Sequence, residues 1–365
     1  MFAITVVVFL LTHDEMGSQQ QLQYYHIDLD FSQHFNKCWM LEKGDFNLTT
    51  VDLSYVYTDF EATVLGLIVA SISITGTILN AVVICALLRN PEIRKEYLTP
   101  SIISIAVTDL IFCVLCLPVH SLHFFTQDMP LPSCQLFAII GFGTWICSEW
   151  NLIGVAVLRL SVINSVNNSG VRGVFPRARK FIPISTWIVT YLLIMPTLLN
   201  KYGRFGLECR SMTCKMISLN VNDEKIKFGP ERFFGGISVI IGIILLFLNI
   251  ALYRQVRKKV AMFVNDFEDS TNENARKWLE KEKKVGKMMG TVTVLYFLVY
   301  CLVVAVRVVI GPNSAIDHPW LTAGHYLIAW SIGVIDPMVY IFWRKKYRDE
   351  VKSLLNIDFK NCTHL

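Results

Sequence analysis

The stretch Ala62–Leu88, ATVLGLIVASISITGTILNAVVICALL, contains no charged side chain. A helix needs about 20 mostly apolar residues to cross the roughly 30 Å hydrocarbon core of a bilayer. Three other stretches of comparable length are also free of charge: Phe181–Asn200, Phe233–Tyr253 and Met288–Val306. These four stretches predict helices that span a membrane.

Three more apolar stretches contain a single acidic residue each. They are Tyr97–Thr126 with Asp109, Leu131–Leu158 with Glu149, and Pro319–Trp343 with Asp336. The chain is 53% hydrophobic and 17% charged, whereas soluble domains carry roughly a quarter charged residues. We therefore expect an all-α protein, a bundle of seven transmembrane helices, and not an ordinary soluble enzyme.

Basic residues between the spans predict the orientation of the chain. They follow span one, separate spans three and four, fill Arg254–Lys287 between spans five and six, and follow span seven as Arg344-Lys345-Lys346. By the positive-inside rule these segments are cytoplasmic. This distribution accounts for the net charge of +5 by membrane topology, and no nucleic-acid partner is expected. We expect a multi-pass protein of the plasma membrane with its amino terminus outside.

Three regions are expected on this basis. Residues 1–60 form an extracellular segment, in which residues 1–17 are either a weak signal peptide or a plain apolar end. Residues 61–343 form the membrane domain, and residues 344–365 form an amphipathic helix and a short cytoplasmic tail. The outer segment contains a glycosylation sequon at Asn47.

Four of the ten cysteines are expected outside the membrane: Cys38, Cys134, Cys209 and Cys214. This even number allows two disulfides in an oxidising compartment. The spacing alone does not decide which cysteines pair.

Several motifs occur in order, each in its expected span. They are Gly76 and Asn80 in span one, Asp109 in span two, Cys134 and Arg159 at the two ends of span three, Trp187 and Pro196 in span four, and Asp336-Pro337-Met338-Val339-Tyr340 in span seven. Together they resemble the rhodopsin-like (class A) G-protein-coupled receptors. This resemblance implies a receptor for an extracellular ligand that couples to a heterotrimeric G protein, with residues 344–355 as an eighth helix on the inner membrane surface.

A narrower resemblance is carried by Tyr202–Gly206, with Cys214 beyond it, and by Gly143 and Ser148. These short stretches are similar to the arthropod orphan receptors called Moody and Trapped-in-endoderm. The resemblance implies a disulfide between Cys134 and Cys214, which leaves Cys38 and Cys209 for a second one.

The chain departs from the family at its switch positions. The family's Asp-Arg-Tyr triplet reads Leu158-Arg159-Leu160, Asn249 replaces a tyrosine in span five, and residues 297–303 lack the usual Trp-x-Pro. The resemblance assigns G-protein coupling to Arg159 and Tyr340. Two readings stay open: a loosened switch that still couples, or a non-coupling atypical receptor that scavenges a ligand or serves in guidance or adhesion.

Ionisable residues inside a bilayer cost at least about 2.5 kcal/mol, so they usually face the bundle interior. We expect Asp109 and Asp336 to form a polar switch site with Asn80 and Ser148. In related receptors this site holds a sodium ion, here at Asp109, while a shared proton or a water is the alternative; no other cofactor is expected. Glu149 is either a neutral structural residue or a conformational proton switch.

Candidates for the ligand pocket lie in the outer halves of the spans: His120, His123, Trp145, Arg307, His325 and Trp330. Gly141 takes the place of the aspartate of amine receptors, and span seven has no lysine for a retinal Schiff base. The sequence shows no nucleophile–base set or phosphate loop for an enzyme, and no paired broken spans for a channel or transporter.

Overall fold

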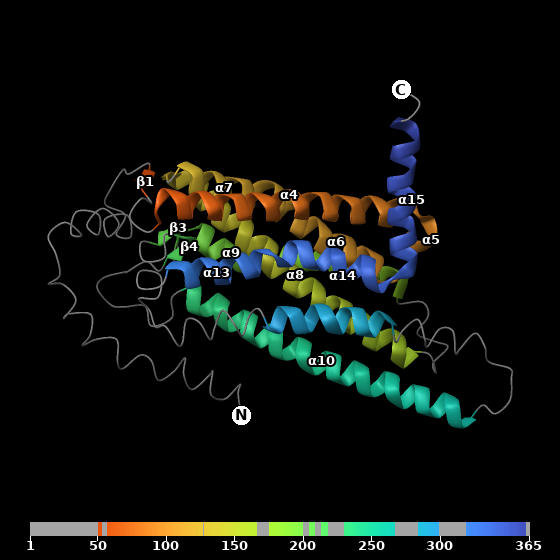
Figure 1. Ribbon diagram of the computed structural model, residues 1–365. Coiled ribbons are helices and arrows are strands. Elements are labelled where there is room, and N and C mark those ends of the chain that lie inside the picture. Colours follow the sequence, from red (N-terminus) through yellow and green to blue (C-terminus); the bar gives the residue numbers. More distant parts are fainter. Residues whose placement is uncertain are drawn as a thin grey trace.

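A computed structural model of the chain describes residues 50–52, 57–126, 128–165, 175–199, 204–208, 213–217, 230–266, 284–298 and 319–362. Long helices lie side by side along one direction, and the helix near the carboxyl end stands across them (Figure 1). Short strands lie at one end of the bundle, called the strand end below. The opposite end, where the crossing helix lies, is called the α15 end.

The first long helix, α4 (Asp59–Arg89), contains the uncharged stretch and begins at a capping box. The Glu61 amide donates to Thr58 Oγ1 at 3.3 Å, and the Thr58 amide donates to Glu61 Oε2 at 2.9 Å. These bonds satisfy two backbone donors that the first turn of a helix leaves free. After α4, Asn90 accepts hydrogen bonds from the Glu92 and Ile93 amides and starts the short helix α5 (Pro91–Arg94).

The second span is one continuous helical path with a wider turn in its middle. It consists of α6 (Thr99–Ile111), the π-helical turn η2 (Phe112–Cys116) and α7 (Leu117–Thr126). Pro118 has no N–H to donate to the preceding turn, so an α-helical ladder is interrupted there. The wider turn directly before Pro118 accommodates this interruption.

The third span, α8 (Leu131–Ser165), is the central helix of the bundle. In its membrane-crossing part 67% of the residues are buried, against 28% in α4 and 22% in α10. The fourth and fifth spans are α9 (Phe175–Leu198) and α10 (Pro230–Asp266), so α10 continues well beyond the apolar stretch that predicted it.

Residues 284–298 form the described part of the sixth span, and the rest of the expected stretch lies outside the described residues. The seventh span consists of α13 (Pro319–Trp330) and α14 (Ile332–Trp343). The amphipathic helix α15 (Lys345–Cys362) follows. Among the described residues, six helices are long and apolar enough to cross a membrane.

Two antiparallel strand pairs, which the sequence analysis did not predict, lie at the strand end. β1 (Thr50–Asp52) pairs with β2 (Asp128–Pro130), and β3 (Arg204–Glu208) pairs with β4 (Thr213–Ile217). The first pair ties the chain before α4 to the link between α7 and α8. Both pairs belong to connecting segments, so the bundle itself is helical.

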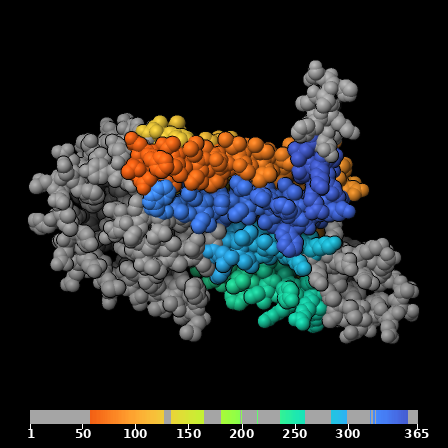
Figure 2. Space-filling model, in the orientation of Figure 1, coloured from red at the N-terminus to blue at the C-terminus, as the bar shows by residue number. Residues whose placement is uncertain are grey.

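The distribution of side chains is the reverse of that in a soluble protein. Large apolar side chains of α4 are exposed, including Leu67, Ile74 and Ile78, and α10 exposes Phe247 in the same way. Asparagine, aspartate, glutamate and arginine side chains are buried instead. Figure 2 shows one outer face of the bundle, on which α4, α13 with α14, residues 284–298 and α10 follow one another. An apolar outer surface of this kind fits a hydrocarbon environment.

Candidate functional site

The four residues of the expected polar switch site lie within the middle of the bundle. Asn80 is fully buried and donates from Nδ2 to the carbonyl oxygens of Gly76 at 2.9 Å and Gly333 at 2.7 Å. This second bond joins α4 to α14. A β-carbon on Gly333 would lie 3.9 Å from the Asp109 β-carbon, so α14 packs closely against Asp109 as well.

Asp109 and Asp336 are both buried and lie close enough to interact electrostatically. Ser148 is 3.0 Å from Thr108 Oγ1, and it is also hydrogen-bonded to Tyr296. The site therefore connects α4, α6, α8, residues 284–298 and α14. α6 contributes Thr108 and Asp109, and α14 contributes the Gly333 carbonyl and Asp336, so groups far apart in the sequence meet here.

Three oxygen atoms of the site have no hydrogen-bond partner among the described residues: Asn80 Oδ1, Asp109 Oδ2 and Asp336 Oδ2. A buried polar atom without a partner is costly, so such atoms usually bind water or an ion. Oxygen ligands suit small hard cations. Among the described residues, no three histidine, cysteine or acidic side chains form a group that could hold a metal ion.

At the α15 end, Arg159 and Tyr340 are almost completely buried. Tyr340 belongs to a large apolar cluster with Leu158 of α8, and this cluster also includes residues of the sixth span: Val285, Met288, Met289 and Val292. Leu158, in the place of the family's acidic residue, therefore contributes apolar packing. The sequence analysis noted the missing charge but did not foresee what replaces it.

A second feature of the α15 end joins α15 to the segment around α5. Arg344 Nη2 lies 2.8 Å from Glu96 Oε2, both side chains are nearly buried, and the Arg344 guanidinium lies over the Tyr347 ring at 4.6 Å. Asn90 Nδ2 donates to Glu350 Oε2 at 3.0 Å. These contacts hold α15 across the bundle.

An exposed ion pair accompanies these contacts. Lys346 Nζ lies 3.0 Å from Glu92 Oε2 and donates a hydrogen bond that holds the pKa of the Glu92 carboxyl below its usual range. Both side chains are exposed, so solvent screens this pair. The buried pair is therefore that of Arg344, at the junction of α14 and α15, with Glu96, which follows α5.

Toward the strand end, three of the six ligand-pocket candidates lie together. The His120 ring is 4.6 Å from the Trp330 ring and 5.7 Å from the His123 ring, measured between centroids. Phe137 of α8 stacks on His120 at 4.8 Å. Both histidines are buried. This aromatic cluster joins α7, α8 and α13, and Phe137 is a member that the sequence analysis missed.

The other three candidates are not placed in this cluster. Trp145 is partly exposed, and its ring contact is with Phe142, one turn earlier on α8. Arg307 and the side chain of His325 lie outside the described residues. Gly141 faces α6 and α7 near their junction, where a β-carbon would lie 3.5 Å from the Phe112 ring.

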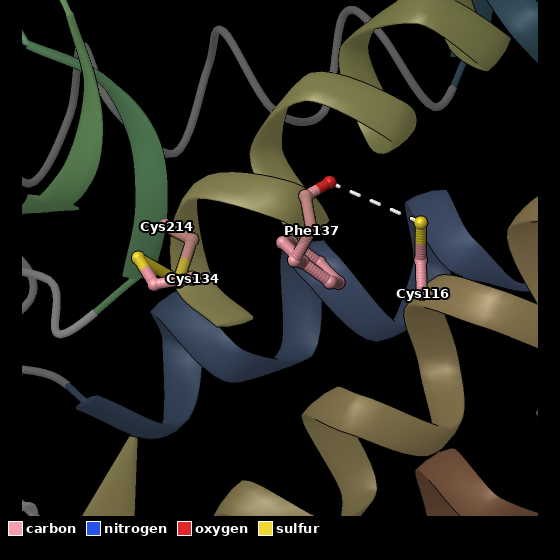
Figure 3. Close-up of a disulfide and its surroundings, with 4 residues drawn as sticks. All are labelled: Cys116, Cys134, Phe137 and Cys214. Carbon is pink, nitrogen blue, oxygen red and sulfur yellow. Dashed lines mark hydrogen bonds between the residues drawn. A yellow bond between two sulfur atoms is a disulfide. The ribbon is translucent and has the colours of Figure 1, made fainter. Parts of the chain in front are cut away.

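A disulfide joins Cys134 at the start of α8 to Cys214 of β4, with a Cα–Cα distance of 5.2 Å (Figure 3). This is the pairing that the resemblance implied. It fixes the β3–β4 pair next to Phe137, whose carbonyl oxygen accepts a long hydrogen bond from Cys116 Sγ. Cys38, Cys209 and the sequon at Asn47 lie outside the described residues, so the second disulfide and the glycosylation stay predictions.

Glu149 is buried and accepts a hydrogen bond at 2.9 Å from Ser238 of α10. Farther along α10, Asn249 Nδ2 donates to Thr293 Oγ1 at 3.1 Å. Asn249 follows Ser238 by about three helical turns, so the two residues share one face of the helix. They are isolated polar residues in an otherwise apolar stretch, and that pattern is the signal by which sequence reasoning could have found both contacts.

The sequence profile of the 7 transmembrane receptor (rhodopsin family) matches residues 79–340. Protein trapped in endoderm-1 of Drosophila melanogaster is 24% identical over 307 residues, which cover 79% of this chain and 76% of that protein. The G-protein coupled receptor moody of the same fly is 30% identical over 167 residues, which are 43% of this chain but only 23% of moody.

The same arrangement of helices occurs in a solved structure. The crystal structure of squid rhodopsin superposes with a TM-score of 0.70 at 17% sequence identity, covering 87% of this chain and 93% of that one. The expected bundle of seven transmembrane helices is thereby confirmed. At this level of identity the likeness speaks for the fold and not for the ligand.

Proposed function

This chain belongs to the rhodopsin family of seven-transmembrane receptors, and we propose that it transmits an extracellular signal to a heterotrimeric G protein. Members of this family are receptors rather than enzymes, and the chain is a multi-pass membrane protein. The observation that carries the proposal is the burial of Arg159, the family's coupling arginine, beneath the sixth span at the α15 end.

The orientation in this proposal places the strand end outside the cell, in the plasma membrane. The disulfide of Cys134 and Cys214 lies at the strand end, and disulfides form in oxidising compartments. Basic residues gather at the opposite end, where Arg89, Arg94, Lys345 and Lys346 lie, as the positive-inside rule requires for cytoplasmic segments.

The ligand site of the proposal is the aromatic cluster around His120, His123 and Trp330. It combines aromatic surfaces with buried nitrogen atoms, and it connects α7, α8 and α13. A ligand there acts by preferring one arrangement of the helices, and it shifts the equilibrium by no more than its difference in affinity for the two arrangements. His325 and Arg307 stay candidates for the same site, and Trp145 becomes the weakest of the six because it is partly exposed.

The polar switch site supports a sodium ion as part of this proposal. Asp109 and Asp336 supply carboxylate oxygens, and Asn80 and Ser148 contribute neutral ones. Bound sodium neutralises the buried carboxylates and stabilises the arrangement in which α4, α6 and α14 are packed together. The test is the melting temperature of the purified receptor in sodium chloride and in choline chloride: a sodium-dependent rise that Asp109→Asn abolishes supports the ion, while equal values favour a shared proton.

A second function is favoured by one specific observation. Leu158 stands in the place of the acidic neighbour of Arg159 and is buried in the apolar cluster. A receptor that binds its ligand without activating a G protein, as a scavenger or in guidance or adhesion, would tolerate this loss. In the coupling reading, apolar packing takes over the restraint on Arg159.

The two functions are separated by basal G-protein activation in cells that express wild type, Arg159→Ala or Leu158→Asp, with surface amounts matched by labelling. If the receptor couples, wild type activates at least one G-protein class without ligand and both variants activate it less. Arg159→Ala loses the coupling side chain, and Leu158→Asp gives Arg159 an acidic neighbour. Silence of wild type and both variants across every class, at normal surface amounts, would favour the non-coupling function.

A further inference from the structure

Arg159 is buried against the sixth span at a position where the chain has a glycine. A β-carbon built on Gly286 would lie 3.0 Å from Arg159 Nη2 and 3.9 Å from its Cζ. A separation of 3.0 Å is tighter than most real contacts of a β-carbon, so any side chain at 286 would press on the guanidinium. The Arg159 guanidinium therefore lies where a side chain at position 286 would be.

The surroundings of this contact make it specific. Val285, Met288 and Met289 on the same helix are buried in the apolar cluster that contains Leu158. The turn that carries Gly286 therefore lies between residues that are buried in this cluster. Gly290, one turn farther along, has open space where its β-carbon would be. The two glycines share a helix but differ in what faces them.

We propose that Gly286 is a positioning residue that sets the resting state of the receptor by seating Arg159 beneath the sixth span. In this arrangement Gly286 leaves room for the Arg159 guanidinium beside the sixth span, and Leu158 belongs to the apolar cluster at the same end of the bundle. A larger residue at 286 would press on the guanidinium, so we expect the sixth span to move away from the buried arginine. The effect on signalling rests on the proposed G-protein coupling, but the effect on the helix does not.

The test compares Gly286→Leu with Gly290→Leu in the purified full-length receptor in lipid nanodiscs. Both changes replace a glycine in the same helix with the same residue, so their effects on helix propensity match. Spin labels at Lys284 and Lys345, which are exposed side chains at the α15 end, report the distance between the sixth span and the start of α15. Basal nucleotide exchange on added G proteins is measured on the same preparations.

We expect Gly286→Leu to lengthen the distance between the labels and to raise basal exchange roughly tenfold, because overpacking by a few methylenes shifts a two-state equilibrium by about that factor. Gly286→Ala should have a smaller effect in the same direction. Gly290→Leu should match wild type in both measurements. Adding Arg159→Ala to Gly286→Leu should return the distance to the wild-type value, since the group that the leucine displaces is gone.

Two results would overturn the inference. One is an unchanged distance in Gly286→Leu; the other is an equal change in Gly290→Leu, which would show a general effect of bulk in the helix. If Gly286→Leu lengthens the distance between the labels but no G protein exchanges nucleotide, the proposed role of Gly286 in positioning Arg159 is supported. That result would instead contradict the proposed coupling, so the two proposals can fail separately.

Discussion

Side chains that donate hydrogen bonds from one helix to another have different kinds of acceptor on the two sides of the bundle. On the α4 side (α4, η2, α7 and α14) the buried donors bond to backbone carbonyls: Ser73 donates to Cys113 at 2.7 Å, Asn80 to Gly333 at 2.7 Å, and Ser121 to Gly66 at 2.9 Å. The bond from Trp320 of α13 to the Glu61 side chain, at 2.7 Å, is exposed. On the α10 side (α10 and residues 284–298) the bonds join two side chains, as in Ser238 with Glu149 at 2.9 Å and Asn249 with Thr293 at 3.1 Å.

This difference indicates which part of the bundle is built to move. A bond to a carbonyl fixes a side chain to the backbone of the neighbouring helix, so those helices cannot slide without breaking it. A bond between two side chains can be released by a change of rotamer on either helix, whereas a bond to a carbonyl can be released only by the donor side chain. The α4 side is therefore the fixed part, and the α10 side, which also covers Arg159, is the part that we expect to separate when the receptor activates.

The largest effect on stability is expected from Arg344→Ala, at the α15 end of the fixed side. This change leaves Glu96 nearly buried without its cation, and removing one partner of a buried pair costs about 3 kcal/mol or more. We expect the free energy of unfolding in detergent to fall by that amount. Lys346→Ala, which breaks only the exposed pair with Glu92, is the control and should leave the unfolding curve unchanged.

The next largest effect is expected from Asn80→Leu. The leucine cannot donate to Gly333 O, so a buried carbonyl between α4 and α14 loses its partner at a cost of about 2 kcal/mol. Thermal unfolding of the purified receptor would show the loss. Ser71→Ala is the matched control, because the Ser71 hydroxyl bonds only within α4, to Leu67 O, in an exposed position. Equal destabilisation by both variants would contradict the special role of bonds between helices.

A smaller effect on stability, but a clear effect on signalling, is expected from Asn249→Leu. The bond between Asn249 and Thr293 joins the two helices of the movable side, and hydrogen bonds between membrane helices average about 0.6 kcal/mol. We expect basal G-protein activation to change while stability hardly does. Thr293→Val should act in the same way, and the double variant should add nothing, because both changes remove one contact. Additive effects would show that the two residues act separately.

The smallest effect is expected from Ser238→Ala. The serine gives the buried Glu149 a hydrogen bond, and its loss should lower the free energy of unfolding by about 0.6 kcal/mol or less. Glu149→Gln, which keeps an acceptor for Ser238, should be closer to wild type than Glu149→Leu. If Glu149→Gln and Glu149→Leu were equally damaging, the carboxyl group itself, and not its hydrogen bond, would be what the bundle needs.

The fold was predictable from the sequence because membrane-spanning stretches are long and lack charge, as Ala62–Leu88 shows. The polar site was predictable for the same reason: Asp109 and Asp336 stand out in apolar stretches, and a bilayer drives such residues inward. The strand pairs were not predicted, because all four strands have five residues or fewer and β1 pairs with the distant β2. Contacts such as Arg344 with Glu96 were missed because charged residues in loops carry no periodic signal that names their partners.

The ligand cluster was predictable only in part. His120, His123 and Trp330 stood out because histidine and tryptophan are the rarer residue types in these spans, with eight of each in the whole chain. Phe137 was missed because a phenylalanine in an apolar span does not differ from its neighbours in sequence. Gly286 was missed because the importance of a glycine depends on which residue lies next to it in the folded protein. Only the packed structure shows that this residue is Arg159.

The most direct test of the central claim compares two distances in the wild-type receptor, with and without a nucleotide-free G protein. One spin-label pair, at Lys284 and Lys345, spans from the movable side to α15; the other, at Arg94 and Lys352, lies within the fixed α5–α15 contact. We predict that the G protein lengthens the first distance and leaves the second unchanged. If neither distance changes with any class of G protein, or only the second does, the α10 side is not the switch and the account is contradicted.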